Sequence, residues 1–254
     1  MDIFESMMEA KINGIELEIC ANSIYSAKQA QQAGASRVEL CQNLENGGTT
    51  PSYGQIKLVR NQLHIGVHVL IRPRSGDFLY TDDEFQEIIE DIRYCKSVGC
   101  DGVVIGVLNA DGSVDKERME VLVNEAKPMC VVFHRAFDRC NDPQQAMEDI
   151  IGLGCDRILT SGLQNTAWQG KDLLKELIEQ ANGRIEIMPG SGVDASNVKE
   201  ILNYTKATSI HSSAKVIVPS KMIFKSNSVT GMDEDEIYSS KEKVAEIITA
   251  IQSM

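Results

Sequence analysis

Ionisable and thiol side chains alternate with apolar ones in several short segments of the sequence. In Leu17-Glu18-Ile19-Cys20 and Val38-Glu39-Leu40-Cys41, every second residue is a carboxylate or a thiol. His68, His134 and His211 likewise follow a β-branched or aromatic residue. Because side chains alternate across a β-strand, the polar members of each segment should share one face. Carboxylates, imidazoles and thiols that meet on one face can transfer protons or bind a metal ion.

The two cysteines of these segments have the same parity in consecutive predicted strands. The sulfur atoms of Cys20 and Cys41 could therefore approach one ion. Two thiolates suit Cu(I), which is soft and accepts few ligands, whereas zinc would need more of them. The alternative is that both are inert, because free cysteine often acts as a small buried apolar residue. The remaining five are assigned no chemistry: Cys95, Cys100, Cys130, Cys140 and Cys155.

Carboxylates inside a fold require compensating cations, because a buried unpaired charge costs several kcal/mol. If Glu18 and Glu39 point inward, the predicted partners are Arg72, Arg74, Arg135 and a protonated His134. One interpretation is a structural salt-bridge network. The other is a functional pocket, which we favour for the set as a whole, because apolar residues would stabilise a core at lower cost.

Glycines that follow helical patterns divide the chain into repeated units. Gly34, Gly99 and Gly154 each precede a short link and a β-branched segment, as expected of a left-handed helix C-cap and an αβ loop. The predicted strands are Glu16–Cys20, Arg37–Cys41, Val67–Ile71, Val103–Val107, Cys130–His134, Arg157–Thr160, Ile185–Met188 and Ser209–Ser212. The predicted helices are Ser23–Ala33, Tyr53–Gln62, Asp82–Val98, Lys116–Ala126, Pro143–Leu153, Trp168–Ala181, Ala195–Tyr204 and Asp235–Ile251.

Eight alternating strand and helix units predict an α/β fold, a (β/α)8 TIM barrel that forms a single domain over residues 1–254. A doubly wound sheet is the alternative, but Cys20-Ala21-Asn22-Ser23 lacks the glycines of a phosphate-binding fingerprint. The segment 214–234 is predicted to be irregular. Its length suggests a functional loop or an oligomer contact.

The composition limits the class of partner. A net charge of -12 and a pI near 4.8 argue against nucleic acid or an anionic membrane as partner. Seven cysteines without paired spacing suit a reducing compartment, and the first residues lack the pattern of a secretory signal. We therefore expect a cytoplasmic protein.

Two loops near the end of the predicted barrel are rich in glycine and serine. They follow the seventh and eighth strands, where phosphate-binding barrels hold phosphate with backbone N–H groups. The alternative is that they only form a tight turn and an N-cap. The candidate anion-binding residues are Gly190, Ser191, Gly192, Ser212 and Ser213.

Specific strings resemble the CutC family of copper homeostasis proteins along nearly the whole chain. They are Glu39-Leu40-Cys41, the segments 45–52 and 71–78, Phe133 to Asp138, Leu159 to Gly162, and Met188 to Val193. The resemblance implies a self-associating cytoplasmic (β/α)8 barrel that handles copper. Its proposed Cu(I) ligands fall on Cys20 and Cys41. Its pocket residues fall on Glu18, Glu39, Arg72, His134, Arg135, Asp138 and His211. The chain departs from the family at Lys215 and Lys225, where arginine is more usual.

Two functions are therefore predicted as alternatives. The first is a copper homeostasis protein that binds Cu(I) through Cys20 and Cys41. The second is an enzyme acting on a small anionic or phosphorylated metabolite, held by Arg72 and the two glycine-serine loops. There Glu18, Glu39 or His134 would move protons. The barrel alone does not fix a reaction type, because it supports many chemistries.

Overall fold

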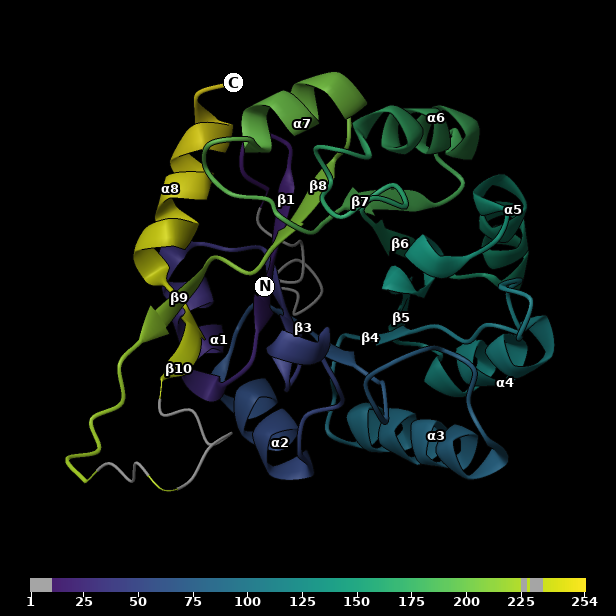
Figure 1. Cartoon of the computed structure of the whole chain (residues 1–254), viewed down its shortest axis with the longest axis horizontal. Coiled ribbons are helices and arrows are strands. Elements are labelled where there is room, and N and C mark those ends of the chain that lie inside the picture. Colours follow the sequence, from purple (N-terminus) through teal and green to yellow (C-terminus); the bar gives the residue numbers. More distant parts are fainter. Residues whose placement is uncertain (1–10, 225–227, 229–234) are drawn as a thin grey trace, which may run out of the picture.

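The computed structural model describes residues 11–224, 228 and 235–254. Its main sheet has eight parallel strands in the order β7-β6-β5-β4-β3-β2-β1-β8, and β7 lies beside β8. The strands thus form a nearly closed ring surrounded by helices (Figure 1), which confirms the (β/α)8 barrel. Their bounds are β1 Glu16–Ala21, β2 Arg37–Leu40, β3 Gly66–Leu70, β4 Gly102–Ile105, β5 Cys130–Phe133, β6 Arg157–Thr160, β7 Glu186–Pro189 and β8 Ser209–Ser212.

The helices alternate with these strands. They are α1 Ile24–Ala33, α2 Tyr53–Gln62, α3 Asp82–Ser97, α4 Lys116–Ala126, α5 Pro143–Leu153, α6 Lys171–Ala181, α7 Val198–Thr205 and α8 Lys241–Gln252. Gly34 and Gly154 are left-handed C-caps, as predicted. Helix α3 instead has Val98 as its C-cap, and Gly99 takes a positive φ one residue later. Helices α6 and α7 begin later than predicted, after caps at Gly170 and Asn197.

Alternation along the strands separates two apolar cores. Leu17, Ile19 and Val38 belong to the large core between strands and helices. A smaller cluster fills the barrel interior: Cys20, Cys41, Leu70, Val104, Val132, Leu159 and Met188. The predicted inward direction of Cys20 and Cys41 is therefore correct. Strands β2 to β5 end one or two residues earlier than predicted, so Cys41 and His134 lie just beyond β2 and β5.

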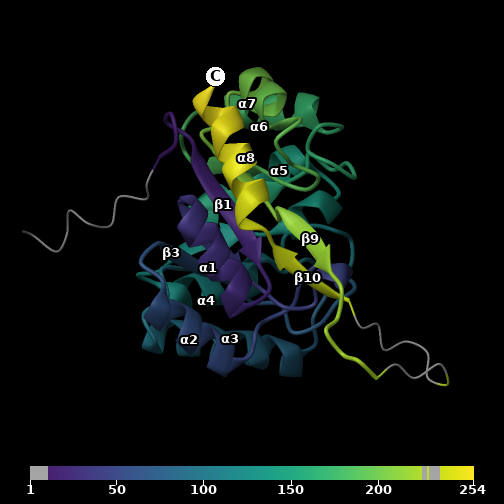
Figure 2. The ribbon, with the colours of Figure 1, turned by 90° about the vertical axis from the view of Figure 1, so that its left-hand side faces the viewer.

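The segment after β8 differs from the prediction. Lys215–Val218 forms strand β9, which pairs antiparallel with β10, Glu236–Ser239. The β-branched residues of β9 and the Ile237-Tyr238 pair of β10 favour strands, and Figure 2 shows the resulting ribbon beside α8. The last helix accordingly begins at Lys241, after Ser240 as N-cap, and not at Asp235. Lys225 lies outside the described residues.

In the part of the chain that the structure describes, none of the helices combines the length and the apolarity needed to span a bilayer.

Candidate functional site

A cavity of about 410 Å³ opens at the carboxyl ends of the barrel strands. This volume suits a small-molecule ligand and lies at the end of the barrel where active sites form. Its wall contains both cysteines and most of the predicted polar residues. The lining residues are Cys20, Glu39, Cys41, Leu44, Gly47, Gly48, Leu70, Arg72, Phe78, His134, Arg135, Leu159, Ser191, Gly192, Val193, His211, Ser212, Ser213 and Lys215.

The two predicted thiols are in contact on one wall of this cavity. The Sγ atoms of Cys20 and Cys41 are 3.3 Å apart, and both residues are buried. The Cys41 backbone N–H donates to the Ala21 carbonyl, which continues the β1–β2 pairing and sets the two side chains next to each other. Hydrogen bonding to Cys41 and burial raise the pKa of Cys20 well above its usual value. The Cys20 thiol is therefore protonated at neutral pH.

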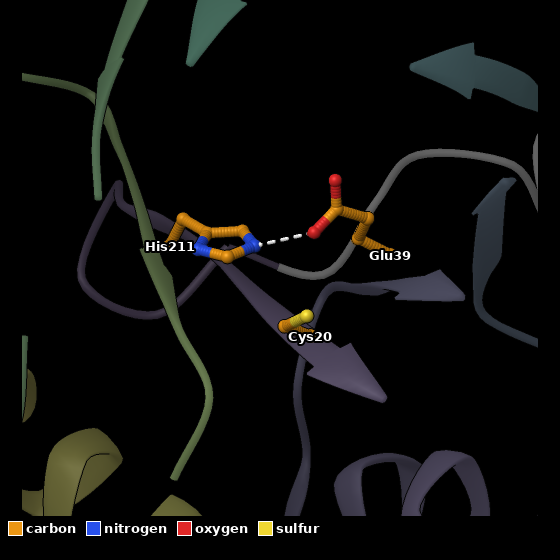
Figure 3. Close-up of side chains that lie close together, drawn as sticks. All are labelled: Cys20, Glu39 and His211. Atoms are coloured by element: carbon orange, nitrogen blue, oxygen red, sulfur yellow. Dashed lines mark hydrogen bonds and ion pairs between the residues drawn. The ribbon is translucent and has the colours of Figure 1, made fainter. Parts of the chain in front are cut away.

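A histidine and a carboxylate lie beside Cys20 (Figure 3). His211 Nε2 is 2.9 Å from Glu39 Oε2. One ligand atom from each of Cys20, Glu39 and His211 lies within 4.8 Å of the others. Burial alone would lower the pKa of His211. Hydrogen bonds to Cys20 and Glu39 outweigh this effect and raise it well above 6.5. The Glu39 carboxylate thus has a cationic partner.

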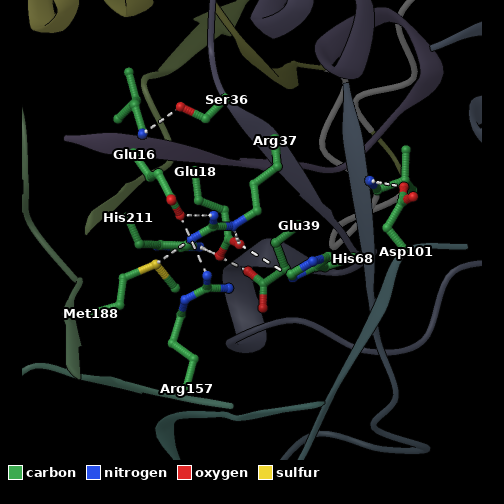
Figure 4. A network of polar contacts seen from close by, with 12 residues as sticks. Glu16, Glu18, Ser36, Arg37, Glu39, His68, Asp101, Arg157, Met188 and His211 are labelled. Atoms are coloured by element: carbon green, nitrogen blue, oxygen red, sulfur yellow. Dashed lines mark hydrogen bonds and ion pairs between the residues drawn. The ribbon is translucent and has the colours of Figure 1, made fainter. Parts of the chain in front are cut away.

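Glu18 lies below the cavity in a network of buried charges (Figure 4). Arg37, which is fully buried, donates from Nε to Glu18 Oε2 at 2.5 Å and from Nη1 to Glu16 Oε2 at 2.7 Å. Arg157 donates to Glu186 at 2.5 Å. Burial would raise the pKa of Glu18, but the charges of Arg37 and His211 outweigh it and lower the pKa to about 2.

The predicted counter-ions for the buried carboxylates are therefore wrong. Arg37 neutralises Glu18, and His211 pairs with Glu39, in place of Arg72, Arg74 or Arg135. Arg37 is two residues before Glu39 on the same strand, so the alternation of side chains places it on the same inward face. What the sequence did not show is the register that sets Arg37 opposite Glu18.

His134 has a defined tautomer. The Ala136 backbone N–H donates to His134 Nδ1 at 3.2 Å. The proton of the neutral ring must therefore be on Nε2. Nε2 is buried and has no hydrogen-bond partner among the described residues. Burial and the nearby Arg72 charge lower the pKa of His134 to about 3, so the ring is neutral at pH 7.

Three other predicted residues hold the loops around the cavity. Arg72 donates to the carbonyls of Gly48 and Gly76, at 2.8 Å each. Arg135, in the cavity wall, donates to Asp138 Oδ2 at 2.7 Å. Asp138 also accepts from the Ser161 backbone N–H, so it positions Arg135 and does not line the cavity.

The glycine-serine loops meet at the cavity, which Ser213 lines, but the hydroxyl groups of Ser191 and Ser212 are bonded within the protein. Ser191 Oγ donates to the Asn165 carbonyl, and Ser212 Oγ donates to the Val193 carbonyl. Gly190 does not line the cavity, and its N–H donates to the Thr160 carbonyl. Any anion held here would bind backbone N–H groups more than hydroxyls.

Gly106 allows the His134 ring to lie against strand β4. A Cβ atom at Gly106 would be 2.6 Å from His134 Nδ1. We expect Gly106→Ala to displace the ring and lower the free energy of unfolding by about 1–3 kcal/mol. Gly152→Ala is the matched control, because nothing lies within 4 Å of its added Cβ in helix α5. That control should be stabilised by about 0.5–1 kcal/mol. Urea unfolding measures both, and equal effects of the two would contradict the prediction.

Some lining residues were not predicted. Phe78 stacks under the Arg72 guanidinium at 4.9 Å and contacts the His134 ring at 5.0 Å. It lies in the string 71–78 that resembles the CutC family, but the spacing of residues does not assign a role to an apolar side chain in a loop. Leu44 and Gly47 come from the loop after β2, whose position depends on Arg72.

Known proteins match this chain over all eight strands of the barrel. The model of the CutC family matches residues 15–216. The human copper homeostasis protein cutC homolog is 46% identical over 217 residues, which are 85% of this chain and 80% of the human protein. The CutC protein of Chromobacterium violaceum is 46% identical over 93% of this chain and 96% of its own. The solved CutC structure from Streptococcus agalactiae has a TM-score of 0.75 at 39% identity, covering 78% of this chain and 98% of that one. This chain belongs to the CutC family of copper homeostasis proteins.

Proposed function

We propose that this protein binds Cu(I) through Cys20 and Cys41 as its part in copper homeostasis. The observation that supports the proposal is the 3.3 Å contact between the two sulfur atoms in the cavity wall. Soft thiolate ligands select Cu(I) over harder ions. Binding would displace the proton that Cys20 carries at neutral pH.

The geometry of the thiol pair favours a third ligand. With a metal–sulfur bond of about 2.3 Å, as in zinc thiolates, sulfur atoms 3.3 Å apart would subtend roughly 90° at the ion. Such a bent pair leaves one side of the ion open. His211 lies next to Cys20 on that wall and can supply a nitrogen once it loses its proton. We therefore propose a site of two sulfur ligands and one nitrogen ligand.

Replacing both thiols tests the proposal. The Cys20→Ser/Cys41→Ser variant should lose Cu(I) affinity by more than about 100-fold, because even altered outer-shell contacts of a metal site cost 10–100-fold. Competition with a chromophoric Cu(I) chelator under anaerobic conditions measures the affinity. Cys140→Ser is the matched control, since Cys140 is also buried but does not line the cavity. Unchanged affinity in the double variant would refute the proposal.

The same thiol pair supports a cytoplasmic location. Free sulfur atoms at this separation are close to disulfide-forming distance, and they persist as thiols in a reducing compartment. We therefore propose that the protein acts in the cytoplasm.

Self-association, which the family implies, stays a prediction. Apolar side chains on and after β9 are strongly exposed: Ile217, Met222, Ile223 and Phe224. A second copy of the chain could cover them, as is common for exposed apolar patches.

A further inference from the structure

The cavity contains a buried hydrogen-bond donor that copper binding does not use. His134 is 4% exposed, its Nδ1 accepts from Ala136, and its Nε2–H has no acceptor in the described part of the chain. A buried polar group without a partner destabilises the folded protein. A neutral imidazole N–H is also a poor ligand for a soft cation, because its proton occupies the position that the metal would take. The N–H group is instead suited to donate a hydrogen bond to an acceptor oxygen.

The charge near His134 points to the same class of ligand. Arg72 is 5% exposed, and its guanidinium bonds to neutral carbonyls of Gly48 and Gly76. Within residues 11–224, 228 and 235–254 it has no ion pair with a carboxylate. Lys215, also in the wall, has none in that part either. A protein with a net charge of -12 thus presents two cations without carboxylate partners in one cavity. The buried charge of Arg72, with the exposed Lys215 beside the same cavity, favours an anionic ligand.

We propose that the cavity is also a binding site for a small organic oxyanion, one oxygen of which accepts the hydrogen bond of His134 Nε2–H while its charge faces Arg72. The volume agrees, because about 410 Å³ is far more than one metal ion fills. The thiol pair lies at the carboxyl ends of β1 and β2, whereas His134 follows β5, so the two would serve different ligands. This proposal goes beyond copper binding and does not depend on it.

Carboxylates and phosphates share the required chemistry. Both offer a charged oxygen acceptor to a neutral N–H and a guanidinium. Arg135 and the backbone at Ser191 and Gly192, both with positive φ, form the rim of the same cavity. A phosphate would use that rim, whereas a plain carboxylate would need only His134 and Arg72.

Calorimetric titration of the metal-free full chain with three probes separates the two sources. The probes are inorganic phosphate, glycolate and 2-phosphoglycolate. We expect 2-phosphoglycolate to bind at least as tightly as either of the others. Binding of glycolate without phosphate would assign the site to carboxylates, and the reverse would assign it to phosphates. Failure of all three to bind at about 10 mM, a free energy weaker than roughly -3 kcal/mol, would overturn the proposal.

Two variants of His134 test the donor. His134→Leu removes the N–H, whereas His134→Gln keeps a donor near the position of Nε2, and both lose the bond to Ala136. We expect His134→Leu to weaken binding of the best probe roughly tenfold, and His134→Gln to restore most of it. His64→Leu is the matched control, because His64 is exposed and precedes β3 at the other end of the barrel. Equal affinity of wild type and His134→Leu would overturn the proposal.

A measurement on the wild type keeps the test valid if the variants fold poorly. Imidazole ¹⁵N spectra of the free protein should show His134 neutral with its proton on Nε2. Addition of the bound probe should move that proton downfield, and an unmoved signal at saturation would refute the contact. Cu(I) titration of ligand-free protein is a separate measurement, so the copper proposal and this one can fail independently.

Discussion

An Arg37→Met variant is expected to lose about 3–5 kcal/mol of unfolding free energy, the typical cost of breaking a buried ion pair by removing one partner. Arg37 is fully buried and bonds to both Glu16 and Glu18. Methionine is similar in length but has no charge, so Glu18 would remain buried without its main counter-ion. Guanidinium unfolding followed by circular dichroism measures the change.

Two comparisons isolate the buried charge. Arg184→Met breaks a pair with Glu148 in which both side chains are well exposed, and should cost at most about 1 kcal/mol. Adding Glu18→Gln to Arg37→Met removes the orphaned carboxylate and should recover part of the loss, a coupling that a double-mutant cycle measures. If Arg37→Met costs no more than Arg184→Met, the buried network does not stabilise the barrel as described.

This network separates the lower and upper parts of the barrel interior. Glu16, Glu18, Arg37 and Arg157 form pairs below the cavity, whereas Glu39 and His211 form a pair in its wall. Glu18 is therefore paired within the network and does not line the cavity, so we do not expect it to contact a ligand, contrary to the prediction from the sequence. The cavity retains the groups that can contact one: thiols on one side, and His134 with Arg72 on the other.

Strand parity predicted which side chains enter the barrel, because apolar outward residues such as Leu17 and Val38 leave their neighbours inside. Parity does not give the register between strands. The contact between Cys20 and Cys41, and the choice of Arg37 as partner of Glu18, both depend on how β1 and β2 align. Register is set by packing over the whole barrel, and a single sequence does not display it.

The other difficult regions depend on distant contacts. Strand β9 is defined by pairing with β10, about twenty residues later, so its own sequence does not distinguish it from a loop. Ser191 and Ser212 were predicted as anion ligands from residue type and position. Whether a hydroxyl is free depends on which carbonyl lies near it, and here Asn165 and Val193 accept both protons.

The unfolding free energy should fall steeply as the pH drops from about 6.5 towards 3. Burial lowers the pKa of His68 and of His134 to about 3, against about 6.5 in the unfolded chain. The pKa of Glu18 is about 2, against about 4.5 unfolded. In this range the unfolded state binds protons that the folded state does not, so acid favours unfolding. His211 has the opposite sign, because its raised pKa stabilises the fold at low pH and loses that effect as the pH rises through the folded value.

Urea unfolding at a series of pH values, with His134→Gln as the comparison, tests this assignment. Each proton taken up on unfolding contributes a slope of about 1.4 kcal/mol per pH unit. Removing the His134 imidazole should reduce the slope between about pH 6.5 and 3 by up to one proton, while the slope due to His68 and Glu18 remains. If the slope of His134→Gln equals that of the wild type, the His134 ring must take up its proton in the folded protein as it does in the unfolded chain. Its charged Nδ1 could then no longer accept the Ala136 N–H.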